Sequence, residues 1–270
     1  MPYFKKGYDK LYYKILNPKA KKSLLCLHGW GTNHAIWSGA EKYLKSYRII
    51  KVDLPGMGKS SYNARKVAPS YLNYTTNLIC NLLDELSIKD FSILGHSIGG
   101  ILAVSISNKL NPKAILLDST PLLGGKGVTT KVKLFATPWM IRTPLYAALR
   151  IPWATRRIVH NTLENIDLIP LKKVNSLIKG FNLANQYALF DSLIDSLKKS
   201  IDSSIKNFTG SFFYIVGENN QTLNGDLMIK FLQDIVKKTK IKKLAKTRHY
   251  PQLENPDEYY KTVDSFLAAV

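Results

Sequence analysis

Short apolar runs alternate with longer amphipathic stretches in the first half of the chain, and this alternation restricts the fold more than any other feature. The runs have the length and continuity of strands buried on both faces: Ser23–Leu27, Arg48–Val52, Phe91–Leu94 and Ala114–Leu117. The stretches between them have helical periodicity: Ala35–Lys45, Tyr71–Leu86 and Ile98–Leu110. Alternating strands and helices require right-handed crossovers. We therefore predict an α/β fold with a doubly wound, mostly parallel sheet.

Both ends of the chain extend this pattern. Tyr12–Leu16 follows a turn at residues 7–9 and predicts half of an N-terminal hairpin. The last part predicts a strand, a helix, a short strand and a final helix: Phe212–Val216, Asp226–Lys238, Lys242–Ala245 and Pro256–Ala268.

Residues 124–205 break the alternation. Gly124 and Gly125 begin this segment, and its prolines divide it into short helical stretches with no strand-like run: Pro138, Pro144, Pro152 and Pro170. We predict an inserted helical cap, or lid, over the carboxyl edge of the sheet, where open α/β sheets bind their ligands. The α/β core then comprises residues 1–123 and 206–270.

Composition excludes several classes of protein. Of 270 residues, 45% are hydrophobic and 21% charged, which suits a globular chain with a large core and excludes disorder, collagen and a disulfide scaffold. No apolar run approaches the roughly 20 residues that cross a bilayer, and the first residues lack a secretory apolar stretch. Cys26 and Cys80 lie in apolar runs and are predicted to be buried free thiols. We expect a cytoplasmic protein without a transmembrane segment.

The charge is unusual, because 39 basic and 19 acidic residues give a net charge of +20. The basic residues are spread along the chain without a block of five, only 7 are arginine, and no nucleic-acid-binding motif accompanies them. We therefore expect no nucleic-acid partner. A lysine-rich solvated surface is the first interpretation, and an acidic partner or anionic substrate is the second.

Cofactor and metal motifs are incomplete. Asp53 stands where a phosphate-binding loop ending at Gly58-Lys59-Ser60 needs glycine, and His34 stands where a dinucleotide fingerprint needs its third glycine. The five histidines and two cysteines lack metal-ligand spacing. We expect neither a cofactor nor a metal.

One pentapeptide has the pattern of a nucleophile. Gly95-His96-Ser97-Ile98-Gly99 lies between a predicted strand and a predicted helix, the context of a nucleophile elbow. Such a sharp turn needs small neighbours, because side chains at Gly95 and Gly99 would collide with adjacent backbone. The turn would expose the Ser97 hydroxyl and direct the first N–H groups of the helix at the reacting oxygen.

With these residues the chain resembles the α/β-hydrolase family over nearly its whole length. His28-Gly29-Trp30-Gly31 is similar to the family's oxyanion-hole loop, and residues 52–60 are similar to the loop after its fourth strand. His249-Tyr250-Pro251 resembles its late histidine loop. The His-Gly-Trp-Gly form also occurs in carboxylesterases such as the pimeloyl-carrier-protein methyl esterases, a narrower and more modest resemblance.

The resemblance implies a serine carboxylesterase or thioesterase that works through an acyl-enzyme. Ser97 would be the nucleophile, and His249 its general base and later its general acid. The backbone N–H groups of Trp30 and Ile98 would form the oxyanion hole.

The third member of the triad departs from the family pattern. The family usually places its acid a few residues after the strand predicted at 212–216, and Asn220 occupies that position. Three hypotheses stay open: Asp118, at the end of the preceding strand, is the acid; Glu218 reaches round; or Asn220 itself orients His249. Asn220 also supports an alternative function, a non-catalytic ligand-binding protein with a degenerate triad.

The predicted cap suggests a substrate. Four large side chains could form the walls of a site for an apolar acyl chain or simply pack on the core: Trp139, Met140, Tyr146 and Trp153. Four of the seven arginines lie in the same segment: Arg142, Arg150, Arg156 and Arg157. We therefore expect a small-molecule or carrier-bound acyl ester as substrate, an acidic partner at the basic cap, and a monomer or homodimer.

Overall fold

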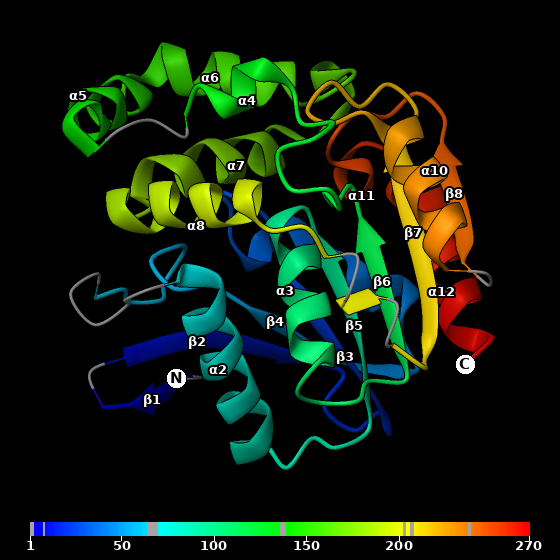
Figure 1. Ribbon diagram of the computed structural model, residues 1–270. Coiled ribbons are helices and arrows are strands. Elements are labelled where there is room, and N and C mark those ends of the chain that lie inside the picture. Colours follow the sequence, from blue (N-terminus) through cyan, green and yellow to red (C-terminus); the bar gives the residue numbers. More distant parts are fainter. Residues whose placement is uncertain are drawn as a thin grey trace.

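The protein, in a computed structural model, is built on one eight-stranded sheet with the order β1-β2-β4-β3-β5-β6-β7-β8 (Figure 1). The pairs β1–β2 and β2–β4 are antiparallel, and the other neighbouring pairs are parallel. The strands are β1 (Tyr3–Lys6), β2 (Asp9–Leu16), β3 (Lys22–Leu27), β4 (Tyr47–Val52), β5 (Phe91–His96), β6 (Ala114–Asp118), β7 (Ser211–Gly217) and β8 (Lys240–Leu244). The structure describes residues 3–7, 9–63, 70–135, 139–201, 204–205, 208–236 and 239–270, and only the backbone of 139–142. The predicted doubly wound, mostly parallel sheet is confirmed.

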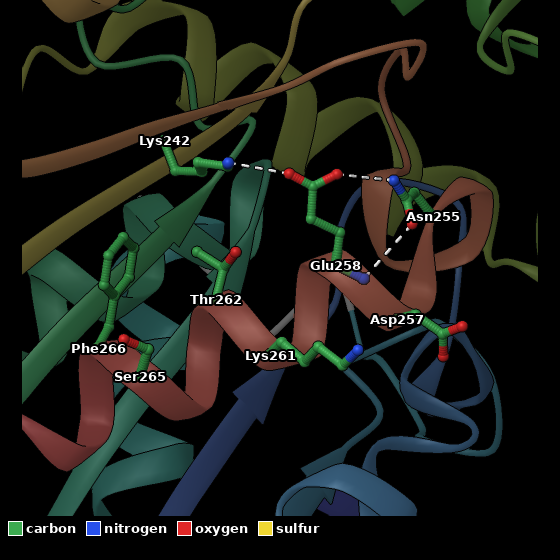
Figure 2. A pocket seen from close by; sticks show the side chains of 8 residues that line it. All are labelled: Lys242, Asn255, Asp257, Glu258, Lys261, Thr262, Ser265 and Phe266. Carbon is green, nitrogen blue, oxygen red and sulfur yellow. Dashed lines mark hydrogen bonds and ion pairs between the residues drawn. The ribbon is translucent and has the colours of Figure 1, made fainter.

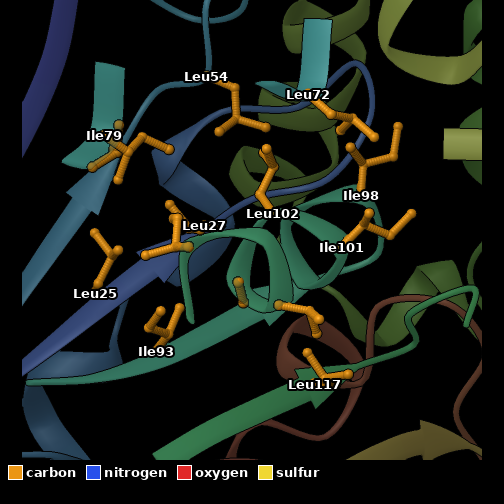
Figure 3. Packing of buried hydrophobic residues seen from close by; sticks show 14 of the residues in the cluster. Leu25, Leu27, Leu54, Leu72, Ile79, Ile93, Ile98, Ile101, Leu102 and Leu117 are labelled. Atoms are coloured by element: carbon orange, nitrogen blue, oxygen red, sulfur yellow. The ribbon is translucent and has the colours of Figure 1, made fainter. Parts of the chain in front are cut away.

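Helices cover both faces of the sheet. Outside the segment between β6 and β7 they are η1 (His34–Trp37), α1 (Ala40–Tyr43), α2 (Tyr71–Glu85), α3 (Ile98–Ser107), α10 (Gly225–Ile235), α11 (Pro251–Glu254) and α12 (Pro256–Ala268). Successive strand residues point to opposite faces, so Leu25 and Leu27 pack with α2, α3 and α10, whereas Leu24 and Cys26 pack with η1, α1 and α12. Figure 3 shows the first of these clusters, with Leu27 and Leu102 near its centre.

The local sequence explains most element boundaries. Ser70 caps α2, because its side chain accepts a hydrogen bond from the N–H of Asn73. The Asn255 side chain caps α12 in the same way, directly before Pro256 at the first helical position. The predicted helix at 35–45 is wrong: it is divided into η1 and α1, because Gly39 adopts φ 97° between them.

In the described ranges, six helices of three or more residues lie between β6 and β7, over the carboxyl ends of the strands (Figure 1). They are α4 (Thr130–Lys133), α5 (Trp139–Leu149), α6 (Pro152–Asn161), η3 (Ile166–Leu168), α7 (Leu171–Leu183) and α8 (Gln186–Lys198). Helix α7 contacts η1, and α8 contacts α2 and α3, whereas α6 contacts α5 and α7. The inserted helices therefore form an inner layer on the core and an outer layer on the inner one. The division into a core of 1–123 with 206–270 and a cap of 124–205 stays a prediction.

None of the helices in the described ranges is both long and apolar enough to cross a membrane.

The junction of β5 with α3 is packed backbone against backbone. A Cβ atom at Gly95 would meet the carbonyl oxygen of Gly99 and lie 2.6 Å from the Cα of Gly100. A Cβ atom at Gly99 would meet the carbonyl oxygens of Leu27 and His28, at the end of the neighbouring strand β3. Gly95 is therefore required by the tight turn into α3, and Gly99 by the close approach of the end of β3.

We expect Gly95→Ala to lower the free energy of unfolding by about 3 kcal/mol, since the new methyl group meets backbone atoms that cannot rotate away. Gly125→Ala is the matched control: its Cβ atom would lie no closer than 3.4 Å to other atoms, so it should change stability by less than about 1 kcal/mol. Urea denaturation followed by circular dichroism measures both. Equal stability of the two variants would contradict the packing described for the junction.

Candidate active site

Ser97 lies at the turn between β5 and α3, with φ 53° and ψ −119°. A positive φ is strained for a residue with a side chain, and such strain persists only where the surroundings enforce it. Here the N–H of Ser97 donates to the carbonyl of Asp118 at 2.8 Å, and the N–H of Gly100 donates to the carbonyl of Ser97 at 2.9 Å. The turn is thus held from both sides, with the hydroxyl at the edge of the sheet.

The loop after β3 runs beside Ser97. A Cβ atom at Gly29 would lie 3.1 Å from the Cβ of Ser97. Neither of the predicted oxyanion donors, the N–H groups of Trp30 and Ile98, has an acceptor within the described part of the chain. The Ile98 N–H also belongs to the first turn of α3, whose dipole favours negative charge. The structure therefore brings free backbone donors and the Ser97 hydroxyl to the same edge of the sheet.

His28 holds this loop in place. Its Nδ1 lies 2.8 Å from the carbonyl oxygen of Gly29, and its Nε2 accepts a hydrogen bond from the N–H of Leu54 at 2.9 Å. Burial lowers the pKa of His28 to about 4. His28 is therefore a neutral structural link between the loop after β3 and the loop after β4.

Ser97 and His249 line one cavity of about 100 Å³. His249 lies between β8 and α11, is 5% exposed, and donates its backbone N–H to the carbonyl of Thr162 at 3.0 Å. Burial and the neighbouring His96 hold the pKa of His249 well below its ordinary value, so the imidazole is neutral. A neutral imidazole is the form that can act as a base.

The cavity walls are apolar and come from the loop after β3, the inserted helices and the loop after β7. They include Trp30, Val132, Phe135, Phe181, Leu193 and Leu223. The Trp30 ring packs on the rings of Phe135 and Phe181. The sequence contained one clue to Phe181: it belongs to a buried stripe of α7 with Val174 and Leu177.

The side chains predicted to bind substrate lie elsewhere. Trp153 begins α6 in the outer layer and is 68% exposed. Tyr146 donates its hydroxyl to the carbonyl of Ala184 at 2.7 Å and lines a separate hollow. The structure thus corrects the prediction for these two residues, because Trp153 lies on the solvent side of α6 and Tyr146 contacts the end of α7, whereas Ile158 is the α6 side chain that lines the Ser97 cavity. The side chains of Trp139 and Met140 lie outside the described residues.

Asp118 does not contact His249. Its Oδ2 lies 3.0 Å from Nδ1 of His96 and accepts a hydrogen bond from the hydroxyl of Tyr259 at 3.2 Å. Asp118 and His96 are both fully buried and are direct neighbours across β5 and β6. The prediction of Asp118 as the acid partner of His249 is therefore corrected: the register of two strands gives this carboxylate a different imidazole. Glu218 is exposed.

Asn220 is the residue that reaches His249. Its side-chain nitrogen Nδ2 lies 3.3 Å from Nδ1 of His249. Its Oδ1 accepts hydrogen bonds from the backbone N–H groups of Thr222 at 2.9 Å and Leu223 at 3.3 Å. Because only an oxygen can accept from those two donors, the amide must present its NH₂ group to the histidine.

This orientation determines the imidazole tautomer. An NH₂ group donates, so Nδ1 of His249 must accept, and the single proton of the neutral ring then resides on Nε2. In a serine triad the carboxylate does the opposite: it accepts from Nδ1–H and leaves Nε2 free to take the proton of the serine. The arrangement therefore has the parts of a nucleophilic site but rests in the unproductive tautomer.

Two further features bear on other kinds of site. No group of three His, Cys, Asp or Glu side chains that could hold a metal occurs in the part of the chain that the structure describes. A separate hollow on α12 is lined by charged residues that satisfy one another: Lys242 Nζ lies 2.9 Å from Oε1 of Glu258, whose Oε2 accepts from Asn255 (Figure 2). It shares no lining residue with the Ser97 cavity.

The sequence is similar to those of known proteins. The model of the Alpha/beta hydrolase family matches residues 24–262. The serine hydrolase-like protein of Danio rerio is 29% identical over 110 residues, 39% of this chain and 33% of that protein. The pimeloyl-[acyl-carrier protein] methyl ester esterase of Wigglesworthia glossinidia brevipalpis is 34% identical over 103 residues, 37% of each. The matches thus span about a third of the length of these curated relatives.

The structure is also similar to solved structures. The esterase EaEST from Exiguobacterium antarcticum superposes with a TM-score of 0.83, covering 99% of both chains at 15% identity. At that identity the similarity shows the fold alone.

We expect the neutral ring of His249 to carry its proton on Nε2 in the wild type and on Nδ1 in Asn220→Asp, because a carboxylate can only accept. Imidazole ¹⁵N chemical shifts, assigned with a His249→Gln variant, distinguish the two tautomers. Asn219→Asp is the control, since the exposed Asn219 pairs with Glu164 and not with His249. The hydrogen-bond assignment of Asn220 fails if the wild type already carries its proton on Nδ1.

We expect Asp118→Asn to lower the free energy of unfolding by about 3 kcal/mol, because it removes the charge from a fully buried carboxylate–imidazole pair. Asp90→Asn is the control. Asp90 pairs with Lys113 at 2.6 Å on the surface, so losing this ion pair should lower the free energy of unfolding by less than about 1 kcal/mol. Urea denaturation measures both. Unchanged stability of Asp118→Asn would show that the carboxylate is not held by His96.

Proposed function

The chain belongs to the alpha/beta hydrolase family, and from this premise we propose that it is a serine hydrolase that cleaves a carboxylic ester or thioester through an acyl-enzyme. The observation that carries the proposal is the strained Ser97 turn, whose hydroxyl shares a cavity with His249 and lies beside two free backbone N–H groups. Strain of this kind is typical of residues whose exposure serves chemistry.

The reaction proceeds in two steps. Ser97 Oγ attacks the carbonyl carbon as His249 takes its proton, and the oxyanion of the tetrahedral intermediate accepts hydrogen bonds from the N–H groups of Trp30 and Ile98. His249 then gives the proton to the leaving alcohol or thiol. A water molecule, activated by the same imidazole, hydrolyses the acyl-enzyme and regenerates the serine.

Asn220 makes this reaction slow in the wild type. The imidazole must leave the tautomer that Asn220 favours before Nε2 can accept the serine proton, and the imidazolium that forms then faces an amide instead of a carboxylate. In a serine protease the same exchange of carboxylate for amide costs about 10⁴ in rate. This orientation also favours the second candidate function, a protein that binds an ester in the cavity without turning it over.

The lining and the volume of the cavity favour a substrate whose acyl group is neutral, apolar and short. No Lys, Arg, Asp or Glu is among the described residues that line it, and its volume of about 100 Å³ is small against the roughly 300–1,000 Å³ of sites for drug-sized molecules. A carrier-bound ester, the class named for the Wigglesworthia relative, is a second substrate class, because the arginines of the inserted segment suit an acidic carrier.

We expect a fluorophosphonate probe to label the wild type on Ser97 and not to label Ser97→Ala. We also expect p-nitrophenyl butyrate to be hydrolysed faster than p-nitrophenyl palmitate, because the cavity is small. Mass spectrometry locates the label, and absorbance follows the hydrolysis. Ser192→Ala is the control, since Ser192 is a buried serine that donates to the carbonyl of Leu189. Labelling that persists in Ser97→Ala would overturn the proposal.

We expect Asn220→Asp to raise kcat for p-nitrophenyl butyrate by roughly 10²–10⁴-fold, because a carboxylate restores the productive tautomer and stabilises the imidazolium. The pH profile should move too. The pKa of His249 lies well below 6.5 in the wild type, so activity persists as pH falls below that value. A carboxylate beside the ring raises its pKa, so the acidic limb should move to higher pH. If Ser97 is labelled but kcat does not rise in Asn220→Asp, Asn220 is excluded as the residue that limits the rate. If neither the wild type nor Asn220→Asp is labelled or turns over the ester, the binding function is favoured.

A further inference from the structure

The outward face of α6 combines an exposed tryptophan with two arginines and a histidine. Trp153, Arg156, Arg157 and His160 are three or four positions apart, so they lie on one side of the helix, and all of them are exposed. The opposite side buries Thr155 and Val159. Figure 1 shows α6 on the outer side of α7, at the end of the molecule that α5 and α6 form together.

Exposed apolar side chains gather in the inserted helices. Nine large hydrophobic side chains are exposed among the described residues, and seven of them lie between residues 130 and 190: Leu134, Ile151, Trp153, Leu168, Leu171, Leu183 and Tyr187. Ile151 directly precedes α6, and Leu183 of α7 lines a surface hollow together with Arg150. Exposed apolar side chains therefore accompany the basic residues of the inserted segment.

Helix α6 and the segment before it contain no negative charge, and two acidic residues that follow are engaged elsewhere. No Asp or Glu occurs in residues 139–161. Glu164 pairs with Arg248, and Asp195 accepts hydrogen bonds from Ser70 and from the N–H of Leu72. Arg156 and Arg157 make no ion pair with any described residue. The outward face is thus positive without internal neutralisation.

We propose that this face, formed by Trp153, Arg156, Arg157 and His160 of α6, binds the surface of a lipid bilayer that contains anionic headgroups. Tryptophan lies at membrane interfaces, where the ring contacts acyl chains while nearby arginines bind headgroup phosphates. The chain as a whole is +20, so the remaining basic residues strengthen attraction to an extended negative surface.

A bilayer fits these features better than an acidic protein does. A protein partner is anchored by side chains that insert into well-packed pockets, whereas here Trp153 protrudes 68% exposed from a convex helix. Two exposed arginines lie one helical turn from an exposed indole, an arrangement that suits a surface where anionic headgroups lie above apolar acyl chains. The docking does not depend on Ser97, but it would bring apolar esters to the inserted helices that form the cavity walls.

The test measures binding of the whole chain to vesicles of phosphatidylcholine, with and without phosphatidylglycerol, by co-sedimentation. We expect binding only to the anionic vesicles, weakened by salt. Arg156→Glu/Arg157→Glu should lower the partition coefficient for anionic vesicles by at least roughly 30-fold, because two basic residues near an anionic membrane surface contribute that much to binding. Bromine-labelled lipid should quench fluorescence of the wild type more than that of Trp153→Phe.

Lys45→Glu/Lys89→Glu is the matched control. It makes the same change in net charge at two exposed lysines that directly precede β4 and β5, at the opposite edge of the sheet from the inserted helices. We expect it to weaken binding less than about threefold. Ser97→Ala should bind as the wild type does, which separates this proposal from the catalytic one. Equal losses in the two charge-reversed variants, or binding to polyglutamate without binding to anionic vesicles, would overturn the proposal.

Discussion

The close contact between the ends of β3 and β5 is the constraint on which the site depends. Gly99 fits against the carbonyl groups of Leu27 and His28 with no room for a Cβ atom, so the turn that carries Ser97 and the loop that carries Trp30 converge. Parallel neighbouring strands bring their carboxyl ends to the same edge, and two backbone segments can approach this closely only where side chains are absent. The proposed nucleophile Ser97 and the proposed N–H donors are therefore positioned by main chain, and His28 fixes the loop that carries Trp30.

The imidazole, in contrast, is positioned by side chains, and there the site differs from a serine triad. Burial keeps His249 neutral, as a base must be. The hydrogen bond from the Asn220 amide then decides which ring nitrogen carries the proton. Asn220 is itself held by two backbone N–H groups, so its amide cannot reverse without losing both bonds. The carboxylate of Asp118 lies beneath, paired with His96, and supports the packing of β5 and β6.

The inserted helices have two kinds of surface. The inner helices α7 and α8 contribute Phe181 and Leu193 to the cavity and pack on the core. The outer helix α6 buries Thr155 and Val159 and contributes Ile158 to the cavity, whereas its Trp153, Arg156 and Arg157 are exposed to solvent. The residues most conspicuous in the sequence, the tryptophan and arginines of 150–157, thus belong to the outside of the molecule, where binding to a surface is the role open to them.

The sequence by itself determined the fold and singled out Ser97 as the proposed nucleophile, because both depend on local patterns: apolar runs that must be buried on both faces, and glycines around a serine at a strand end. It also marked Asn220 as a departure. Only the tertiary structure decided which acid meets which imidazole and which side chains line the cavity. Strand register paired Asp118 with His96, and layering moved Tyr146 and Trp153 away from Ser97. Such contacts join residues far apart in the chain, and no local pattern specifies them.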